Sequence, residues 1–310
     1  MSQILQYLPF SNYKKYLRPA VDGCMGLMTH VAELTWSDGI QRESYVKFYG
    51  ENKKRALLNE ALGYLLINGL KLPQPELAGF LEFKISEETT PEIWVQASEI
   101  DKYRGVTYAW ICTNTGGINR RIEIDNANSP ELKSYLTTHV IEALKSWEKL
   151  PNLIMCDDWL ANNDRNMGNL LELPNKTFTL IDHGGILYGD NWSPWDIMRN
   201  AVINGKFQKM YVNIFKQNFN GLFWKENLLN ALEEIKSEHG TSFESVKDEA
   251  CQLINDFLGD EKIHVGFPPN PVQNVSNILQ DFLATNAVQV GNIEAKCDLW
   301  LSATQTNVAK

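Results

Sequence analysis

The chain has 310 residues, of which 44% are hydrophobic and 22% are charged. This balance is that of an ordinary globular protein, so it excludes a disordered or fibrous chain, and the length allows one large domain or two modest ones. Lys and Arg number 29 against 38 Asp and Glu, a formal net charge of −9. That surplus argues against a protein that binds nucleic acid mainly by neutralising phosphates.

The cysteines and the apolar stretches limit the class of protein further. Five cysteines are widely scattered and form no C-x-x-C pair, so we expect neither a disulfide framework nor a zinc site. No run of about 18 consecutive apolar residues occurs, and the first residues lack a basic segment followed by an apolar one. We therefore expect a cytoplasmic protein that makes no membrane contact.

The first hundred residues read as a small sheet with one helix. Alternating segments at 31–36 and 43–50 flank S-D-G-I-Q-R and predict a β-hairpin. Apolar residues at helical spacing predict a helix over 53–70, ending near a glycine. Short apolar runs at 77–83 and 92–98 predict two further strands.

The remainder reads as mainly helical. A long helix is predicted over 131–150, a short one through L-I-M-C-D-D-W-L-A, and a strand–turn–strand unit over 169–185. Three more periodic stretches predict helices at 224–238, 244–258 and 272–284. We therefore predict an α+β fold with two parts, a β-rich part over residues 1–103 and a larger, mainly helical part over 104–310.

The densest polar cluster is D-R-N-M-G-N at 164–169, followed after an apolar strand pair by I-D-H-G at 181–184. A carboxylate, an amide five residues later and a second carboxylate after a hairpin are what phosphoryl transfer needs. Asp164 would orient the acceptor hydroxyl, while Asn169 and Asp182 would hold Mg²⁺ on the phosphates of a nucleotide.

Other groups that this chemistry requires occur in the matching order. A loop carries Gly23 and Gly26, Lys47 follows late in the second strand of the hairpin, and Glu60 lies in the next helix. Lys47 would contact the α- and β-phosphates, and Glu60 would fix it through an ion pair. The alternative for Lys47 is a solvated strand lysine, and for Glu60 an exposed position on the helix.

These motifs resemble those of the HipA-like kinases and, more distantly, the phosphoinositide kinases. The resemblance covers about residues 20–190 and implies a two-lobed, protein-kinase-like fold with a small β-rich N-lobe and a mainly helical C-lobe. It also implies ATP and Mg²⁺ as cofactors, and a protein Ser or Thr as acceptor. Some HipA-like kinases are toxins with a DNA-binding antitoxin, which makes an antitoxin-like protein a candidate partner. The motifs are Y-V-K-F at 45–48, N-E-A-L-G-Y-L-L at 59–66, G-L-K-L-P-Q-P-E at 69–76, D-x-W-L-x-N-x-D-R-N-x-x-N at 157–169 and L-I-D-H-G at 180–184.

The sequence also departs from the protein-kinase pattern. The metal motif reads I-D-H-G where protein kinases have D-F-G, so we assign His183 a structural or switching role rather than a ligand role. H-R-D is missing before the catalytic loop, and the glycine loop is not G-x-G-x-x-G. Asp157 and Asn162 are expected to brace the catalytic loop. Adenine is expected at the exit of the strand predicted over 92–98, near Gln96, Ser98 and Glu99.

Two other functions stay open at this point. A lipid or small-molecule kinase would suit the phosphoinositide-like D-R-N-x-x-N, although a net charge of −9 disfavours an anionic lipid substrate. A pseudokinase or binding module would keep the fold without the chemistry. The presence of Lys47, Asp164, Asn169 and Asp182 argues against this second alternative.

Overall fold

The computed structural model describes the chain from residue 4 to 288 with several gaps. Residues 21–27, which contain Gly23 and Gly26, lie outside the described part, so the predicted glycine loop does too. The described residues are 4–20, 28–49, 53–99, 102, 106–162, 164–189, 192, 221–264 and 272–288.

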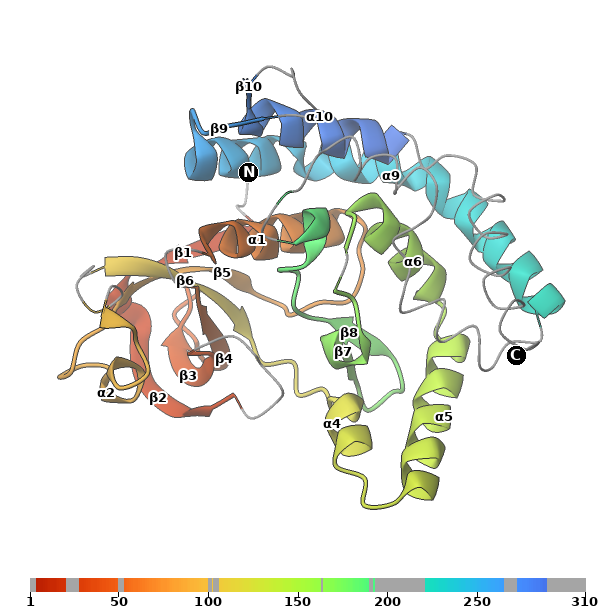
Figure 1. Cartoon of the computed structure of the whole chain (residues 1–310), viewed down its shortest axis with the longest axis horizontal. Helices are drawn as coiled ribbons and strands as arrows, with labels where there is room; N and C mark the ends of the chain where they lie inside the picture. Colours follow the sequence, from red (N-terminus) through yellow and green to blue (C-terminus); the bar gives the residue numbers. More distant parts are fainter. Residues whose placement is uncertain are drawn as a thin grey trace.

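A six-stranded mixed sheet forms one side of the molecule (Figure 1). Its strand order is β1-β5-β6-β4-β3-β2; β1 pairs with β5 in parallel, and the other neighbours are antiparallel. The predicted hairpin is confirmed as β3 and β4, and the strand predicted over 77–83 as β5. The strands are β1 (Leu5–Leu8), β2 (Tyr13–Pro19), β3 (His30–Thr35), β4 (Gln41–Phe48), β5 (Ala78–Lys84) and β6 (Val106–Thr113).

The parallel pairing of β1 depends on a glycine in β5. Gln6 lies opposite Gly79, and a Cβ atom added to Gly79 would lie 1.9 Å from the carbonyl oxygen of Gln6. No side chain fits at that distance, so any other residue at position 79 would push β1 away from the sheet.

The two faces of the sheet bury different cores. Along β4, Tyr45 packs with the core that contains α1 (Lys54–Gly69), whereas Val46 and Phe48 belong to the core on the opposite face. This division follows from the two-residue period of a strand, and it directs Lys47 toward α1. The opposite face is covered in part by the short helix α2 (Pro91–Trp94) and the turn after it, through Ile93 and Ala97.

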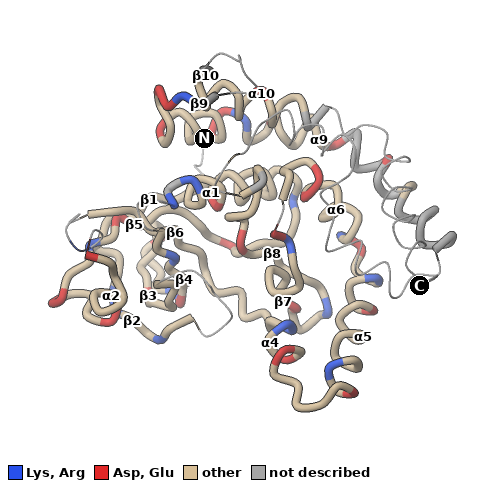
Figure 2. Tube along the Cα trace, in the orientation of Figure 1, with Lys and Arg blue, Asp and Glu red and all other residues tan. Residues whose placement is uncertain are grey.

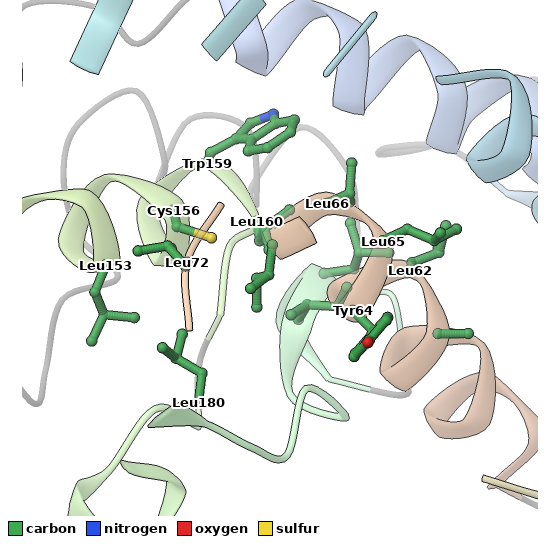
Figure 3. Close-up of a cluster of buried hydrophobic side chains, with 14 of the residues drawn as sticks. Leu62, Tyr64, Leu65, Leu66, Leu72, Leu153, Cys156, Trp159, Leu160 and Leu180 are labelled. Carbon is green, nitrogen blue, oxygen red and sulfur yellow. The ribbon is translucent and has the colours of Figure 1, made fainter. Parts of the chain in front are cut away.

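Helix α1 lies at the centre of the larger core, and the helix predicted over 53–70 is confirmed. Positions 56–67 are all buried, as expected for a helix with neighbours on every side. Figure 3 shows its leucines packed against α6 (Leu150–Trp159) and β8 (Phe178–Leu180). Truncation of one such leucine to alanine would cost about 2–5 kcal/mol.

The helical part joins the sheet through α4 (Arg120–Asp125) and contains α5 (Pro130–Ser146), α6 and the hairpin of β7 (Leu170–Glu172) with β8. The strand–turn–strand prediction is confirmed by this hairpin. The single helix predicted over 131–150 is wrong at its end. The chain turns to an extended conformation at Trp147, and a new helix begins at Leu150 with proline in its first turn.

The last elements lie across α1 and α6 (Figure 1). The helices predicted over 224–238 and 244–258 form one helix, α9 (Gly221–Leu258). Gly240 lies inside this helix and does not end it, since a glycine in a helix interior costs only about 1 kcal/mol relative to alanine. Helix α9 packs against α1, α6 and α10 (Val275–Val288), and a short pairing of β9 (Lys262–His264) with β10 (Val272–Asn274) joins α9 to α10. Among the described helices, none is both long and apolar enough to cross a membrane.

Strand β6 lies beyond the boundary predicted at residue 103, yet it pairs with both β4 and β5. The sheet therefore continues to Thr113, and the segment 114–119 connects it to α4. The structure is α+β, as predicted. The division into two lobes stays a prediction.

Candidate active site

Lys47 lies between two carboxylates that come from distant parts of the chain. Its Nζ atom is 2.7 Å from Oε1 of Glu60 on α1 and 3.2 Å from Oδ1 of Asp182, which follows β8. The Lys47 side chain is 13% exposed and the Glu60 side chain 1% exposed. This pairing excludes the alternative in which Lys47 is a solvated strand lysine and Glu60 an exposed helix residue.

Glu60 is fixed by two further donors. The hydroxyl of Tyr49 donates to Oε1 at 2.8 Å, and the main-chain N–H of His183 donates to Oε2 at 2.7 Å. Both carboxylate oxygens are therefore occupied, which offsets the cost of burying the charge. The bond from His183 also ties α1 to the residue that follows Asp182.

The segment that carries Asp182 is held against α1. Asp182 has a φ of 61°, in the left-handed region that is uncommon for residues other than glycine, although Asp adopts it more readily than most. The amide nitrogen of Asn59, one residue before Glu60, lies within hydrogen-bond distance of three main-chain carbonyls downstream. These are the oxygens of Gly184 at 3.0 Å, Ile186 at 2.9 Å and Gly189 at 3.1 Å.

The catalytic loop predicted at 164–169 is braced from within. Asn169 donates its amide hydrogen to the carbonyl oxygen of Asp164 at 2.9 Å, and Asn162 accepts from the Asp164 N–H at 3.1 Å. Asn162 also donates to Asp157 at 3.0 Å, which agrees with the bracing role expected for both residues. Arg165 forms a buried ion pair with Asp157 at 3.0 Å.

The guanidinium of Arg165 also connects this loop to the segment that carries Asp182. Nη1 of Arg165 donates to the carbonyl oxygen of Ile181, the residue before Asp182, at 3.1 Å. A Cβ atom added to Gly185 would lie 2.5 Å from Cβ of Asp164. Glycine at 185 is therefore what allows the two segments to approach, and the fold brings Asp164, Asn169 and Asp182 to one place.

Lys47, Glu60, Asp164, Asn169 and Asp182 form what we name the Lys47 cluster. Its charged members shift one another's pKa values. Burial acts to lower the pKa of Lys47, but the carboxylates of Asp182 and Glu60 outweigh it and hold this pKa well above its ordinary value. Lys47 in turn lowers the pKa of Asp182, against the effect of burial. At neutral pH the cluster therefore holds a charged lysine beside an ionised Asp182.

Asp164 lies in a different environment. Burial and then the negative charge of Asp182 raise the pKa of Asp164 above its usual range. A carboxylate with a raised pKa accepts a proton more readily, as a catalytic base must. Two neighbouring carboxylates with opposite shifts have the pattern of an acid–base site.

The oxygen donors for a metal ion are few. Within the described part of the chain, no three His, Cys, Asp or Glu side chains gather to hold a metal. Because the amide nitrogen of Asn169 is bonded to Asp164, its Oδ1 atom remains as an oxygen ligand for a metal, and the main-chain oxygen of Asn169 accepts the N–H of Ile181, the residue before Asp182, at 3.1 Å. Mg²⁺ at nucleotide sites takes one or two protein oxygens and completes its shell with phosphates and water, so this pair fits the ion.

His183 is buried, and its ring Nδ1 has no hydrogen-bond partner among the described residues. Burial, followed by the charges of Arg165 and Lys47, holds the pKa of His183 well below its ordinary value, so the ring is neutral. Its Cβ would lie 2.4 Å from a Cβ atom placed on Gly63 of α1. These contacts agree with a structural role.

The residues expected to bind adenine lie elsewhere. The strand predicted over 92–98 is wrong: it is α2 and a turn, with proline in the first turn of the helix. This segment covers the face of the sheet opposite to Lys47, with Gln96 bonded to the Glu92 carbonyl and Glu99 to Lys102. Gln96, Ser98 and Glu99 were expected to bind adenine because they would follow the last strand of the sheet. That strand is β6, so this reason no longer applies to them.

Sequence reasoning missed three contributors to this cluster. Tyr49 is the second donor to Glu60, Asn59 anchors the segment after Asp182, and Gly63 makes room for His183. Tyr49 follows Lys47 by two residues and so extends on the same side of the chain as it does, which is a signal that alternation along β4 contains. Asn59 and Gly63 contact residues more than a hundred positions later in the chain, and a local sequence pattern cannot indicate such contacts.

A cavity of about 700 Å³ lies beside the connection from β6 to α4. Thr113–Gly116 line it, together with Gln74 and Thr179, but no member of the Lys47 cluster does. We therefore place the candidate active site at the Lys47 cluster and not at this cavity.

No protein-family model and no curated protein sequence matches the chain. Among solved structures, the crystal structure of a Helicobacter pylori proinflammatory kinase, CtkA, is similar over 98% of this chain and 100% of its own. Sequence identity is 13% and the TM-score is 0.42. Values this low carry no argument about activity, so the geometry of the cluster has to support any function.

Proposed function

We propose that this chain is an ATP- and Mg²⁺-dependent kinase of the HipA-like type that transfers the γ-phosphate to a Ser or Thr hydroxyl of a protein. The observation that carries the proposal is the position of Lys47, 2.7 Å from Glu60 and 3.2 Å from Asp182. In protein kinases, a lysine on a strand pairs with a glutamate on the following helix, and an aspartate further along the chain holds Mg²⁺. Lys47, Glu60 on α1 and Asp182 after β8 match this arrangement.

Each residue of the cluster has one task in this proposal. Lys47 binds the α- and β-phosphates, and Glu60 fixes its direction. Asp164 orients the acceptor hydroxyl and takes its proton as the oxygen bonds to the γ-phosphorus and the bond to the β–γ bridging oxygen breaks. Asn169 and Asp182 hold Mg²⁺, which neutralises charge on the phosphates.

For adenine we propose the connection after β6 in place of 96–99. The main-chain N–H groups of residues 113, 114, 116, 117 and 118 are all engaged within the protein. The N–H of Thr115 has no hydrogen-bond partner among the described residues, so it is the donor available to a ring nitrogen of the base. The choice of a protein hydroxyl as acceptor rests on the resemblance to the HipA-like kinases.

Intact-mass spectrometry tests the proposal. The wild-type protein is incubated with ATP and Mg²⁺, alone and with dephosphorylated casein, and both proteins are weighed. Lys47→Ala is compared with Lys15→Ala, a lysine on β2 that lies 3.8 Å from a single carboxylate at the surface. We expect phosphate on a protein with the wild type and Lys15→Ala, and none with Lys47→Ala. Absence of transfer, together with a melting temperature that Mg·ATP does not raise, would refute the proposal.

A further inference from the structure

A second cavity, of about 290 Å³, lies between the edge of the sheet and α9, away from the Lys47 cluster. We name it the aromatic pocket. Four of the residues that line it are aromatic and two are acidic: Tyr7, Phe80, Tyr108, Phe257, Glu249 and Asp256.

The rings form a packed wall with an open rim. Tyr7 lies opposite Phe80 in the β1–β5 pair, with ring centroids 5.2 Å apart, and Phe80 is also 5.2 Å from Phe257 of α9. Phe80 is buried, whereas Tyr7 is 49% exposed and Tyr108 is 52% exposed. The pocket thus offers ring faces and edges to a group that enters from solvent.

Both carboxylates come from the face of α9 that turns toward the sheet. Glu249 accepts the main-chain N–H groups of Leu5 at 3.0 Å and Ile4 at 3.2 Å, which fixes its position. Asp256 is exposed, and no Lys or Arg of the described residues forms an ion pair with either carboxylate. Burial and then the charges of Asp256 and Glu249 raise the pKa of Tyr7, so both charges act at its hydroxyl.

We propose that the aromatic pocket binds a cationic side chain, Lys or Arg, from an extended segment of a partner protein. Aromatic rings attract a cation through their faces, and two carboxylates without a cation of their own add to this attraction. The same charges repel nucleotides and other anions. A volume of about 290 Å³ is at the lower end for a small-molecule site but accommodates one long side chain.

The position of the pocket favours a peptide as its occupant. Strand β1 is the edge strand of the sheet, and Glu249 occupies the N–H groups of Ile4 and Leu5, so an extended segment would pass along Gln6–Leu8 while its side chain enters the pocket. This inference does not depend on phosphoryl transfer, because none of the pocket residues belongs to the proposed active site.

Fluorescence anisotropy with labelled pentapeptides tests the proposal at about 0.15 M salt, where the Debye length of roughly 8 Å suppresses general attraction to an acidic protein. The probes are Gly-Val-Arg-Val-Gly, its lysine counterpart and its citrulline counterpart, which is neutral but has the shape of arginine. We expect the two cationic peptides to bind and the citrulline peptide to bind at least about fivefold more weakly.

The variants locate the binding. Asp256→Asn should weaken it roughly two- to fivefold and Tyr108→Leu roughly two- to tenfold. Asp248→Asn is the matched control, because Asp248 is exposed on the same helix but does not line the pocket. Equal weakening by Asp248→Asn, equal binding of the citrulline peptide, or no binding of the cationic peptides would overturn the proposal.

Discussion

Replacing Glu60 by glutamine removes one charge from the centre of the cluster and keeps the shape of the side chain. The carboxylate accepts three hydrogen bonds, from Lys47, Tyr49 and His183. An amide has only one oxygen, so its NH₂ group must face either the donors on Oε1 or the N–H of His183. One donor group is then left against another donor inside the protein.

The size of the effect follows from these contacts. A buried donor without an acceptor costs about 1–3 kcal/mol. Burial, opposed in part by Lys47, raises the pKa of Glu60, so the surroundings disfavour its charge and a neutral side chain escapes that penalty. We therefore expect Glu60→Gln to lower the free energy of unfolding by about 1–3 kcal/mol, which a stability of about 5–15 kcal/mol tolerates. Glu60→Ala removes every acceptor, and about 3–5 kcal/mol is expected.

Urea unfolding followed by tryptophan fluorescence measures this loss, and the initial rate of phosphate transfer measures the loss of orientation at Lys47. A displacement of about 1 Å costs roughly 10²-fold in rate, and we expect a fall of this order in Glu60→Gln. Glu123→Gln is the control. Its carboxylate is 41% exposed and pairs with Arg120 within α4, so less than about 1 kcal/mol and no change in rate are expected. If the two variants behave alike, Glu60 does not hold Lys47 in the manner inferred.

Asp164→Asn should leave ATP binding intact and lower turnover by roughly 10²–10⁴-fold, and a variant that keeps a tenth of wild-type turnover would exclude Asp164 as the base. Asp182→Ala should abolish the Mg²⁺-dependent part of ATP affinity in calorimetric titration, while Asn169→Ala should reduce it less because water replaces a neutral oxygen; equal Mg²⁺ enhancement in all proteins would contradict the metal assignment. His239 packs against Trp159, neither of its ring nitrogens has a partner among the described residues, and burial lowers its pKa to about 4. Because the unfolded state binds this proton near pH 6.5 and the folded state does not, stability is lost as pH falls from 6.5 toward 4, by roughly 2 kcal/mol at pH 5. His239→Leu should stabilise the protein at pH 7. In urea unfolding at pH 7 and pH 5, it should also reduce the loss of stability between the two values, and an unchanged loss would show that His239 does not cause it.

Prediction from sequence succeeded where one local pattern determined the element. The period of 3.6 located α1, and the ion pair expected between Lys47 and Glu60 is present at 2.7 Å. The spacing of Asp164, Asn169 and Asp182 was sufficient to group them, because a tight β-hairpin separates the last two. Roles of these residues in catalysis stay predictions.

Prediction failed where the conformation depends on distant contacts. Strand β1 has four residues and pairs in parallel with a strand more than seventy residues away, which its own sequence does not indicate. The apolar run within 92–98 is typical of a strand, yet Val95 is 77% exposed, and Pro91 begins the short helix α2, which a turn follows. Since that error moved the end of the sheet, it also misplaced the adenine contacts.

The contacts of α9 with β1 and α1 affect how the protein folds during its synthesis. Glu249 holds the first residues of β1, about 245 positions earlier, and α9 covers α1. During synthesis the sheet and α1 emerge before α9, with an apolar helix face that α9 covers and two main-chain N–H groups that Glu249 of α9 accepts. Contacts of such long sequence separation slow folding, and the uncovered helix face invites association with other chains meanwhile. We therefore expect a chain that stops before α9 to aggregate, and the segment from Gly221 onward to determine whether the whole molecule is recovered in soluble form.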